Sequence, residues 1–124
     1  MLMSLLLAAC NEDETISGYA DSAATYILTE IDQNPFSASA TLRFPEAGKI
    51  SGRAPCNRYF AEQELPYPWF KVGPIGATKM ACPALRAEQS FFDAIRAMTL
   101  VEVSGGVLVL SNEDGREMVF KTDP

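Results

Sequence analysis

One stretch of this sequence has the periodicity of an α-helix, and it lies among several short segments typical of β-strands. The helical pattern begins at Pro83, a residue type favoured in the first turn of a helix. Spacings of three and four residues then define a stripe along one side, formed by Leu85, Glu88, Phe91, Phe92, Ile95 and Met98. The opposite side carries Arg86, Gln89, Asp93 and Arg96. We therefore predict one amphipathic helix with a single apolar face.

The predicted strands are rich in β-branched and aromatic residues and are separated by turns that contain Gly, Pro, Asn or Asp. They lie at 25–31, 40–44, 49–52, 59–65, 70–73, 100–103, 107–110 and 117–120. Segments 41–44 and 49–52 form a predicted hairpin across the turn at 45–48. Because one helix cannot cover both faces of a large sheet, the pattern predicts an α+β fold, in which a predominantly antiparallel sheet curls around the helix.

The N-terminus is an apolar run that ends in Leu7-Ala8-Ala9-Cys10. The run is shorter than the roughly 20 residues that span a membrane, and small residues at its end are typical of a secretory signal. Residues 7–10 resemble the bacterial lipobox. We therefore expect residues 1–9 to be the end of a signal peptide and Cys10 to be acylated, so that the membrane becomes a partner of the chain. The alternative is a chance apolar N-terminus with an ordinary cysteine.

Residues 10–21 are polar and acidic, as expected of a solvated tether between a lipid anchor and a domain. No Lys or Arg precedes the apolar run, so we expect the true start codon to lie upstream. By resemblance to Gram-negative lipoproteins, Asn11 directly after Cys10 implies sorting to the outer membrane, facing the periplasm.

Two further cysteines, Cys56 and Cys82, remain once Cys10 is assigned to acylation. In an oxidising compartment, an even pair in a small exported domain is most often a structural disulfide, which is our prediction. Two isolated thiolates without His supply too few ligands for zinc, and the spacing is not the Cys-x-x-Cys of a redox pair. The remaining alternative is that both are buried small apolar residues.

The segments around these cysteines also carry Gly52 and Asn57 in the first and Thr78 and Met80 in the second. With the helix and closing strands that follow, they resemble the META domain family, which includes HslJ-like lipoproteins. The resemblance covers residues 22–124 and implies a small curled or cracked barrel-like sheet on one helix. HslJ-like proteins are linked to heat stress and antibiotic tolerance, which implies a role in envelope maintenance or stress tolerance.

Composition argues against several classes of function. The formal net charge is -6 and there is no His. Because the basic residues are scattered along an acidic chain, we expect no nucleic-acid partner. The absence of His removes the commonest general base and the usual activator of Ser or Cys. We therefore expect no catalytic residue, no metal site and no cofactor.

Large aromatic residues concentrate at 59–70, and Pro66 and Pro68 interleave with Tyr67 and Trp69. If the prolines force these rings outward, Tyr67 and Trp69 are candidates for a partner surface, because exposed Tyr and Trp are favoured contact residues. The alternative is an aromatic corner of the core.

These features together favour a lipid-anchored binding or accessory module of the bacterial envelope, assumed monomeric, that meets an envelope protein through this loop. An alternative is a carrier that holds a lipid or other apolar ligand between helix and sheet, beside Phe92 and Ile95. A third reading is a thiol–disulfide enzyme that uses Cys56 and Cys82.

Overall fold

A computed structural model describes residues 13–122 of the chain. The predicted signal peptide end at 1–9 and the acylation site Cys10 lie outside the described residues.

Antiparallel strands form two sheets in this part of the chain. The larger has the order β2-β1-β9-β8-β7 with β3 beside β1, and consists of β1 (Tyr26–Ile31), β2 (Asn34–Pro35), β3 (Thr41–Leu42), β7 (Leu100–Ser104), β8 (Val107–Ser111) and β9 (Glu117–Thr122). The smaller has the order β4-β5-β6, from β4 (Lys49–Arg53), β5 (Arg58–Glu62) and β6 (Gly76–Ala77). A 3-10 turn, η1 (Ile16–Gly18), precedes β1.

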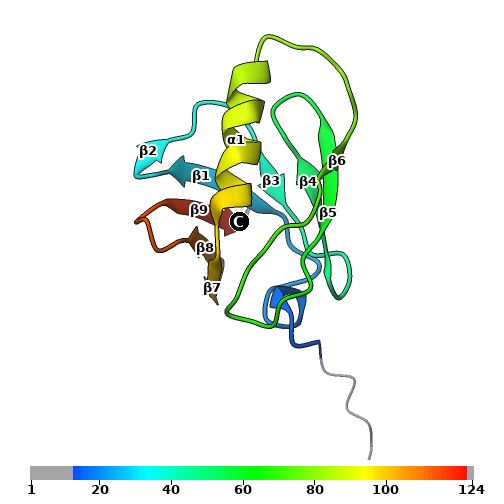
Figure 1. Ribbon diagram of the computed structural model, residues 1–124, viewed down its shortest axis with the longest axis vertical. Helices are drawn as coiled ribbons and strands as arrows, with labels where there is room; N and C mark the ends of the chain where they lie inside the picture. Colours follow the sequence, from blue (N-terminus) through cyan, green and yellow to red (C-terminus); the bar gives the residue numbers. More distant parts are fainter. Residues whose placement is uncertain (1–12, 123–124) are drawn as a thin grey trace, which may run out of the picture.

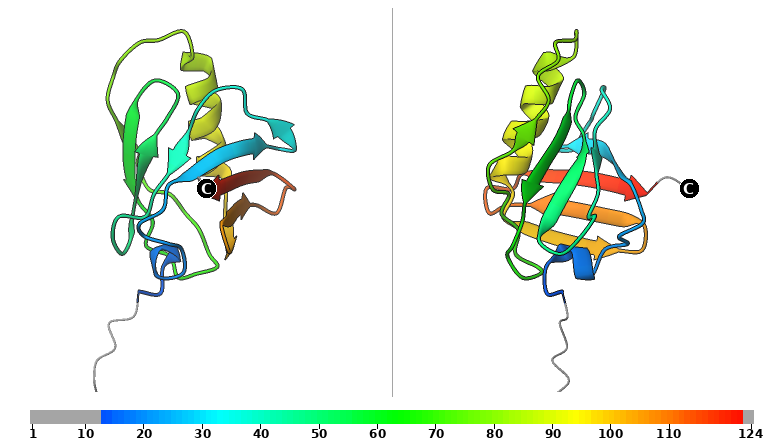
Figure 2. Two further views of the ribbon diagram at one scale, coloured as in Figure 1. Left: turned by 180° about the vertical axis from the view of Figure 1, so that it is seen from behind. Right: turned by 90° about the vertical axis from the view of Figure 1, so that its right-hand side faces the viewer.

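The two sheets face each other, and α1 (Leu85–Ala97) lies along one side between them (Figures 1 and 2). One isolated bridge, between Arg43 directly after β3 and Ser51 of β4, connects the two sheets, and a second attaches Trp69, which belongs to neither sheet, to Leu100 of β7. The strands do not close into one continuous barrel, because each sheet has its own ladder and only the single Arg43–Ser51 bridge between described residues connects them. The predicted α+β fold, with predominantly antiparallel strands and one helix, is confirmed, and in place of the one curled sheet that was predicted the described strands form two sheets.

The helix packs the predicted stripe inward, with one exception at its start. Phe91 and Ile95 are fully buried, and the Phe91 ring meets Tyr59 of β5 edge-on at 5.4 Å between ring centroids. The helix begins at Leu85, two residues later than predicted, because the backbone of Ala84 is not yet helical. Leu85 is 45% exposed, so its placement on the buried stripe was wrong. It lies in the first helical turn, where its side chain turns toward solvent.

The predicted strand at 70–73 is not a strand. Phe70 is buried, but the backbone N–H groups of this segment donate to different partners, from Phe70 to Thr99 O and from Gly73 to Glu62 O. The amide of Lys71 donates to the side chain of Gln63 instead of to a neighbouring strand. Because no single strand receives these bonds in register, the segment joins neither sheet.

Aromatic and aliphatic side chains fill the space enclosed by the sheets and the helix. Gly52 of β4 allows the two sheets to approach, because a Cβ at that position would collide with the carbonyl oxygen of Thr41 on β3. The largest fully buried side chains of the described residues are Ile16, Tyr26, Leu42, Phe44, Ile50, Tyr59, Phe70, Phe91, Ile95, Met98, Leu108 and Phe120.

Candidate functional site

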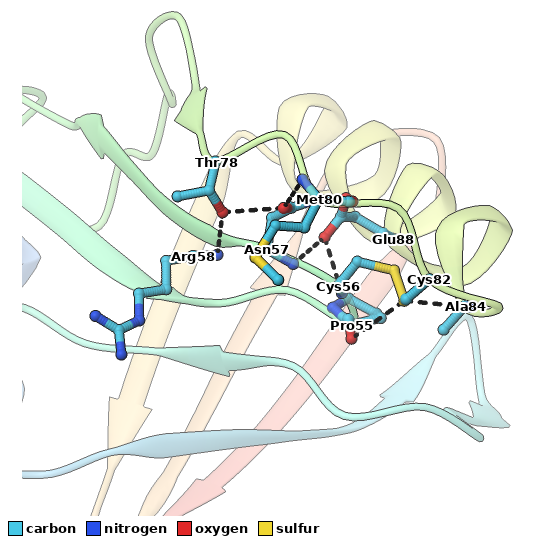
Figure 3. The surroundings of a disulfide bond; sticks show 9 residues. All are labelled: Pro55, Cys56, Asn57, Arg58, Thr78, Met80, Cys82, Ala84 and Glu88. Carbon is cyan, nitrogen blue, oxygen red and sulfur yellow. Dashed lines mark hydrogen bonds between the residues drawn. A yellow bond between two sulfur atoms is a disulfide. The ribbon is translucent and has the colours of Figure 1, made fainter.

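A disulfide joins Cys56 and Cys82, with 5.8 Å between their Cα atoms. Cys56 lies in the short loop between β4 and β5, and Cys82 lies in the segment that leads into α1. The bond therefore ties the tip of the smaller sheet to the start of the helix (Figure 3).

Asn57, beside the disulfide, is 6% exposed and bonds through both ends of its side chain. Its Oδ1 accepts hydrogen bonds from the hydroxyl of Thr78 (2.9 Å) and from the amide of Met80 (2.7 Å). Its Nδ2 donates to Met80 O at 3.2 Å and to Glu88 Oε2 at 2.7 Å. The Asn57 side chain thus forms the backbone hydrogen bonds that a neighbouring strand would otherwise form with the irregular segment before the helix.

Glu88 is the helix residue that completes this group (Figure 3). Its Oε1 accepts hydrogen bonds from the backbone amides of Cys56 (3.0 Å) and Asn57 (2.8 Å). The carboxylate is 6% exposed and satisfies N–H donors of the β4–β5 loop that would otherwise be buried without partners. Sequence reasoning placed Glu88 on the inward face but gave it no role. An acidic residue inside an otherwise apolar stripe was the available signal.

The structure brings together four of the predicted residues, since Asn57, Thr78 and Met80 form one hydrogen-bonded group next to Cys56. We call Asn57, Thr78, Met80 and Glu88 the polar node. Gly52 lies apart from it, at the contact between β4 and β3. Every side-chain oxygen and nitrogen of the node forms a hydrogen bond with another residue of the chain, so the node is arranged to hold the fold together.

Trp69 is 55% exposed although its backbone is held in place. Its bridge to Leu100 attaches it to the edge of β7, and the flanking bonds run from Val101 N to Pro68 O (2.8 Å) and from Phe70 N to Thr99 O (2.9 Å). Alternation of an extended chain turns Phe70 into the core and Trp69 outward. The indole is therefore presented by a fixed segment of backbone.

Tyr67 is half-buried and packs against Tyr19 from the N-terminal segment. The two rings are stacked with centroids 4.3 Å apart, and Tyr19 is 56% exposed. The Tyr67 hydroxyl accepts a hydrogen bond from Val103 N at 3.3 Å, and Tyr67 N donates to Glu14 O at 2.6 Å. We call Tyr19, Tyr67 and Trp69 the aromatic surface. Sequence reasoning did not identify Tyr19, since a tyrosine inside an acidic tether gives no sign of a distant stacking partner.

A family model described as META domain matches residues 21–124. The chain belongs to the META domain family. The match includes both cysteine segments, the helix and the strands that follow it, and so confirms the family inferred from Gly52, Asn57, Thr78 and Met80 in the cysteine segments. Among curated proteins, no sequence match is found.

Solved structures share the fold of this META domain. An NMR structure of a protein from Burkholderia xenovorans is 22% identical, covers 86% of each chain and has a TM-score of 0.65. A crystal structure of a duf4847 family protein from Bacteroides vulgatus ATCC 8482 is 10% identical, covers 81% of this chain and 92% of the other, and has a TM-score of 0.62. At these identities the likeness shows the fold alone.

The phenol of Tyr59 is buried inside the META domain, so it is not accessible as a titrating group. Burial raises the pKa of this phenol far above its ordinary range, and its hydroxyl donates to Thr41 O at 2.5 Å. Residues 13–122 contain no group of three or more His, Cys, Asp or Glu side chains that could hold a metal ion. In that same range, no helix has the length and apolar character needed to cross a membrane.

The interface between helix and sheets is filled by side chains where the carrier hypothesis places a ligand. Phe91, Ala94 and Ile95 are each 0% exposed, and the Tyr59 ring lies 5.7 Å from that of Phe92. A hollow of about 380 Å³ beside Phe92 opens instead on the outer side of the helix, next to Leu85 and Arg96. No feature of the described residues favours an internal ligand.

Proposed function

We propose that this META domain is the binding module of a bacterial envelope lipoprotein, anchored by an acylated Cys10 in the outer membrane and facing the periplasm. It acts without catalysis, as an accessory component of envelope maintenance or stress tolerance. Its partner is an envelope protein that contacts the aromatic surface.

The exposure of Trp69 on a fixed backbone carries the proposal. An indole that is 55% exposed contributes much less to the stability of the fold than a buried indole does. In protein interfaces, by contrast, Trp and Tyr are enriched among the hot-spot residues that supply most of the binding energy. Because bonds on both sides of Trp69 already order its backbone, a partner that covers the ring avoids most of the entropic cost of ordering a loop.

The compartment is supported by the cysteines. Cys56 and Cys82 form a disulfide, and such bonds persist in oxidising compartments such as the periplasm. The location of Cys10 after Leu7-Ala8-Ala9 supports acylation at the start of the mature chain. Part of the predicted tether at 10–21 packs against the domain, through buried Ile16 and the stack of Tyr19 on Tyr67, so a lipid on Cys10 would hold the domain close to the membrane surface.

The test is site-specific photo-crosslinking in the native cells, with a photoreactive amino acid at position 69 and, as a matched control, at position 85, since Leu85 is also a large exposed apolar residue (45%). We expect a discrete crosslinked protein from position 69 and none from position 85. Trp69→Ala should abolish recovery of that protein while changing the free energy of unfolding by less than about 1 kcal/mol. Equal crosslinking at both positions, or a Trp69→Ala variant that unfolds, would overturn the proposal.

Membrane anchoring is tested separately by Cys10→Ser. We expect this variant to leave the membrane fraction and to lose incorporated radioactive palmitate. Retention of either property would contradict acylation at Cys10 and leave the aromatic surface to be judged on the crosslinking alone.

A further inference from the structure

Three arginines from consecutive strand segments, at positions 43, 53 and 58, share one outward face of the smaller sheet and the adjoining strand. The register pairs Arg53 of β4 directly with Arg58 of β5, and the bridge between Arg43 and Ser51 brings Arg43 alongside. Side chains alternate between faces along a strand, so Ser51 and Arg53 point the same way, as do their partners. Arg43, Arg53 and Arg58 are all exposed.

These arginines line a surface hollow of about 560 Å³, together with Thr41, Ser51 and Phe60. No acidic residue is among the described residues that line it. This is unexpected for a chain with 16 acidic and 10 basic residues. The nearest acidic position of the outward row, Glu62, already pairs with Lys49 at 3.6 Å.

The arginines are also without partners of opposite charge. Within residues 13–122, the ion pairs are Lys49–Glu62, Asp93–Arg96 and Asp32–Arg116, and none of them includes Arg43, Arg53 or Arg58. Like charges placed directly opposite each other across a ladder destabilise a sheet. The Arg53–Arg58 pair is therefore a cost to folding that no acidic residue of the described range 13–122 offsets by an ion pair.

We propose that this hollow, the arginine hollow, binds a phosphomonoester group carried by an organic molecule. A dianionic tetrahedral group takes several guanidinium forks and hydroxyl donors at once, whereas one carboxylate is satisfied by a single fork. The hydroxyl of Thr41 accepts a bond from Arg53 N at 2.9 Å and so has its own hydrogen free to donate. The chemistry of the lining therefore matches phosphate better than it matches a carboxylate.

Phe60 supplies a wall for the rest of the ligand. Its ring is 66% exposed and lies over Gly76 of β6, where a Cβ would collide with it. The Phe60 position pairs with Ser51 in the ladder, so the ring stands beside the arginines on the same face. An apolar ring next to a cluster of guanidiniums fits an ester with an organic part better than it fits free phosphate.

The experiment is an NMR titration of the full chain carrying Cys10→Ser, followed through backbone amides and arginine side chains. The soluble probe is glycerol 3-phosphate, with acetate as the carboxylate control. The membrane probe is vesicles of phosphatidylcholine containing phosphatidic acid, compared with vesicles in which phosphatidylglycerol, a phosphodiester, supplies the same nominal charge. We expect saturable shifts at 41–43, 51–53 and 58–60 with the phosphomonoesters, and weaker ones with the controls.

The matched variants are Arg53→Gln/Arg58→Gln and Arg86→Gln/Lys121→Gln, which remove equal charge from the hollow and from elsewhere. Loss of each arginine in the hollow should raise the Kd about tenfold, and the control pair should change it by less than about threefold. Because the first pair relieves like-charge repulsion, its melting temperature should be unchanged or higher, which separates binding from folding.

Binding of glycerol 3-phosphate assigns the hollow to a soluble ester, and binding of phosphatidic acid vesicles alone assigns it to a membrane head group. Equal losses in the two variant pairs, or no saturable shift with either phosphomonoester up to roughly 10 mM, would overturn the proposal. Neither result bears on the aromatic surface, which involves none of these arginines.

Discussion

Glu88 accepts hydrogen bonds from the amides of Cys56 and Asn57 and from the Asn57 side chain. Removing the acceptor leaves these donors buried, and each unsatisfied group costs about 1–3 kcal/mol. We therefore expect Glu88→Ala to lower the free energy of unfolding by about 3–5 kcal/mol, measured by urea denaturation. Few single substitutions in so small a domain should cost as much.

The neighbouring Gln89 provides the control, since it is exposed and lies on the same turn of the helix. Gln89→Ala should change stability by less than about 0.5 kcal/mol. Similar losses for the two variants would mean that the polar node contributes little and that helix propensity sets the effect.

At the scale of elements, Asp32 connects the β1–β2 turn to the start of β9. Its Oδ1 accepts a hydrogen bond from Glu117 N at 3.0 Å, and its Oδ2 lies 3.0 Å from Arg116 Nη2. The bond from the Glu117 amide, together with the Arg116 guanidinium, holds the pKa of Asp32 below its ordinary value of 3.8. The ionised form of Asp32 is therefore the one that stabilises the contact between the β1–β2 turn and the start of β9.

The pH dependence follows from the sign of this shift. A carboxyl whose pKa is lowered by folding contributes its stability above the unfolded pKa and loses it as the pH falls through the folded pKa. We expect Asp32→Asn to cost about 0.5 kcal/mol at pH 7, because the side chain is 38% exposed and screened by solvent. The difference from the native chain should shrink steadily below about pH 4. A difference that stays constant down to pH 2, measured by urea denaturation at each pH, would contradict the assignment.

Elements that follow a strong local pattern could be predicted, and those that depend on distant partners could not. The helix follows from its spacing, although its start is displaced because Ala84 remains outside the helical conformation. The 70–73 segment has a strand-like composition, yet its amides bond to Gln63, Glu62 and Thr99, which no local pattern indicates. Two-residue strands such as β2 and β6 are too short to leave a periodic signal.

At the scale of the whole molecule, strand pairing places side by side residues that are not adjacent in the sequence. Arg43, Arg53 and Arg58 read as scattered charges along an acidic chain, and become neighbours only through the pairing of β4 with β5 and the bridge to Ser51. The polar node is similar, since Asn57, Thr78 and Glu88 come from three separate segments. The family resemblance indicated the importance of Asn57 and Thr78, but it gave no sign of what they contact.

The disulfide acts on the whole chain, because it constrains the unfolded state as well as the native one. Cys56 and Cys82 are separated by 26 residues, and closing a loop of that length stabilises a fold by about 3.5 kcal/mol in the chain-entropy model. We expect Cys56→Ala/Cys82→Ala to lose about this amount in urea denaturation, and native protein with a reducing agent to lose the same. Cys10→Ser lies outside the loop and is the matched control, with no expected change. If the double variant were as stable as the native chain, the polar node alone would hold the β4–β5 loop against the helix. Adding Glu88→Ala to the double variant should then unfold the domain.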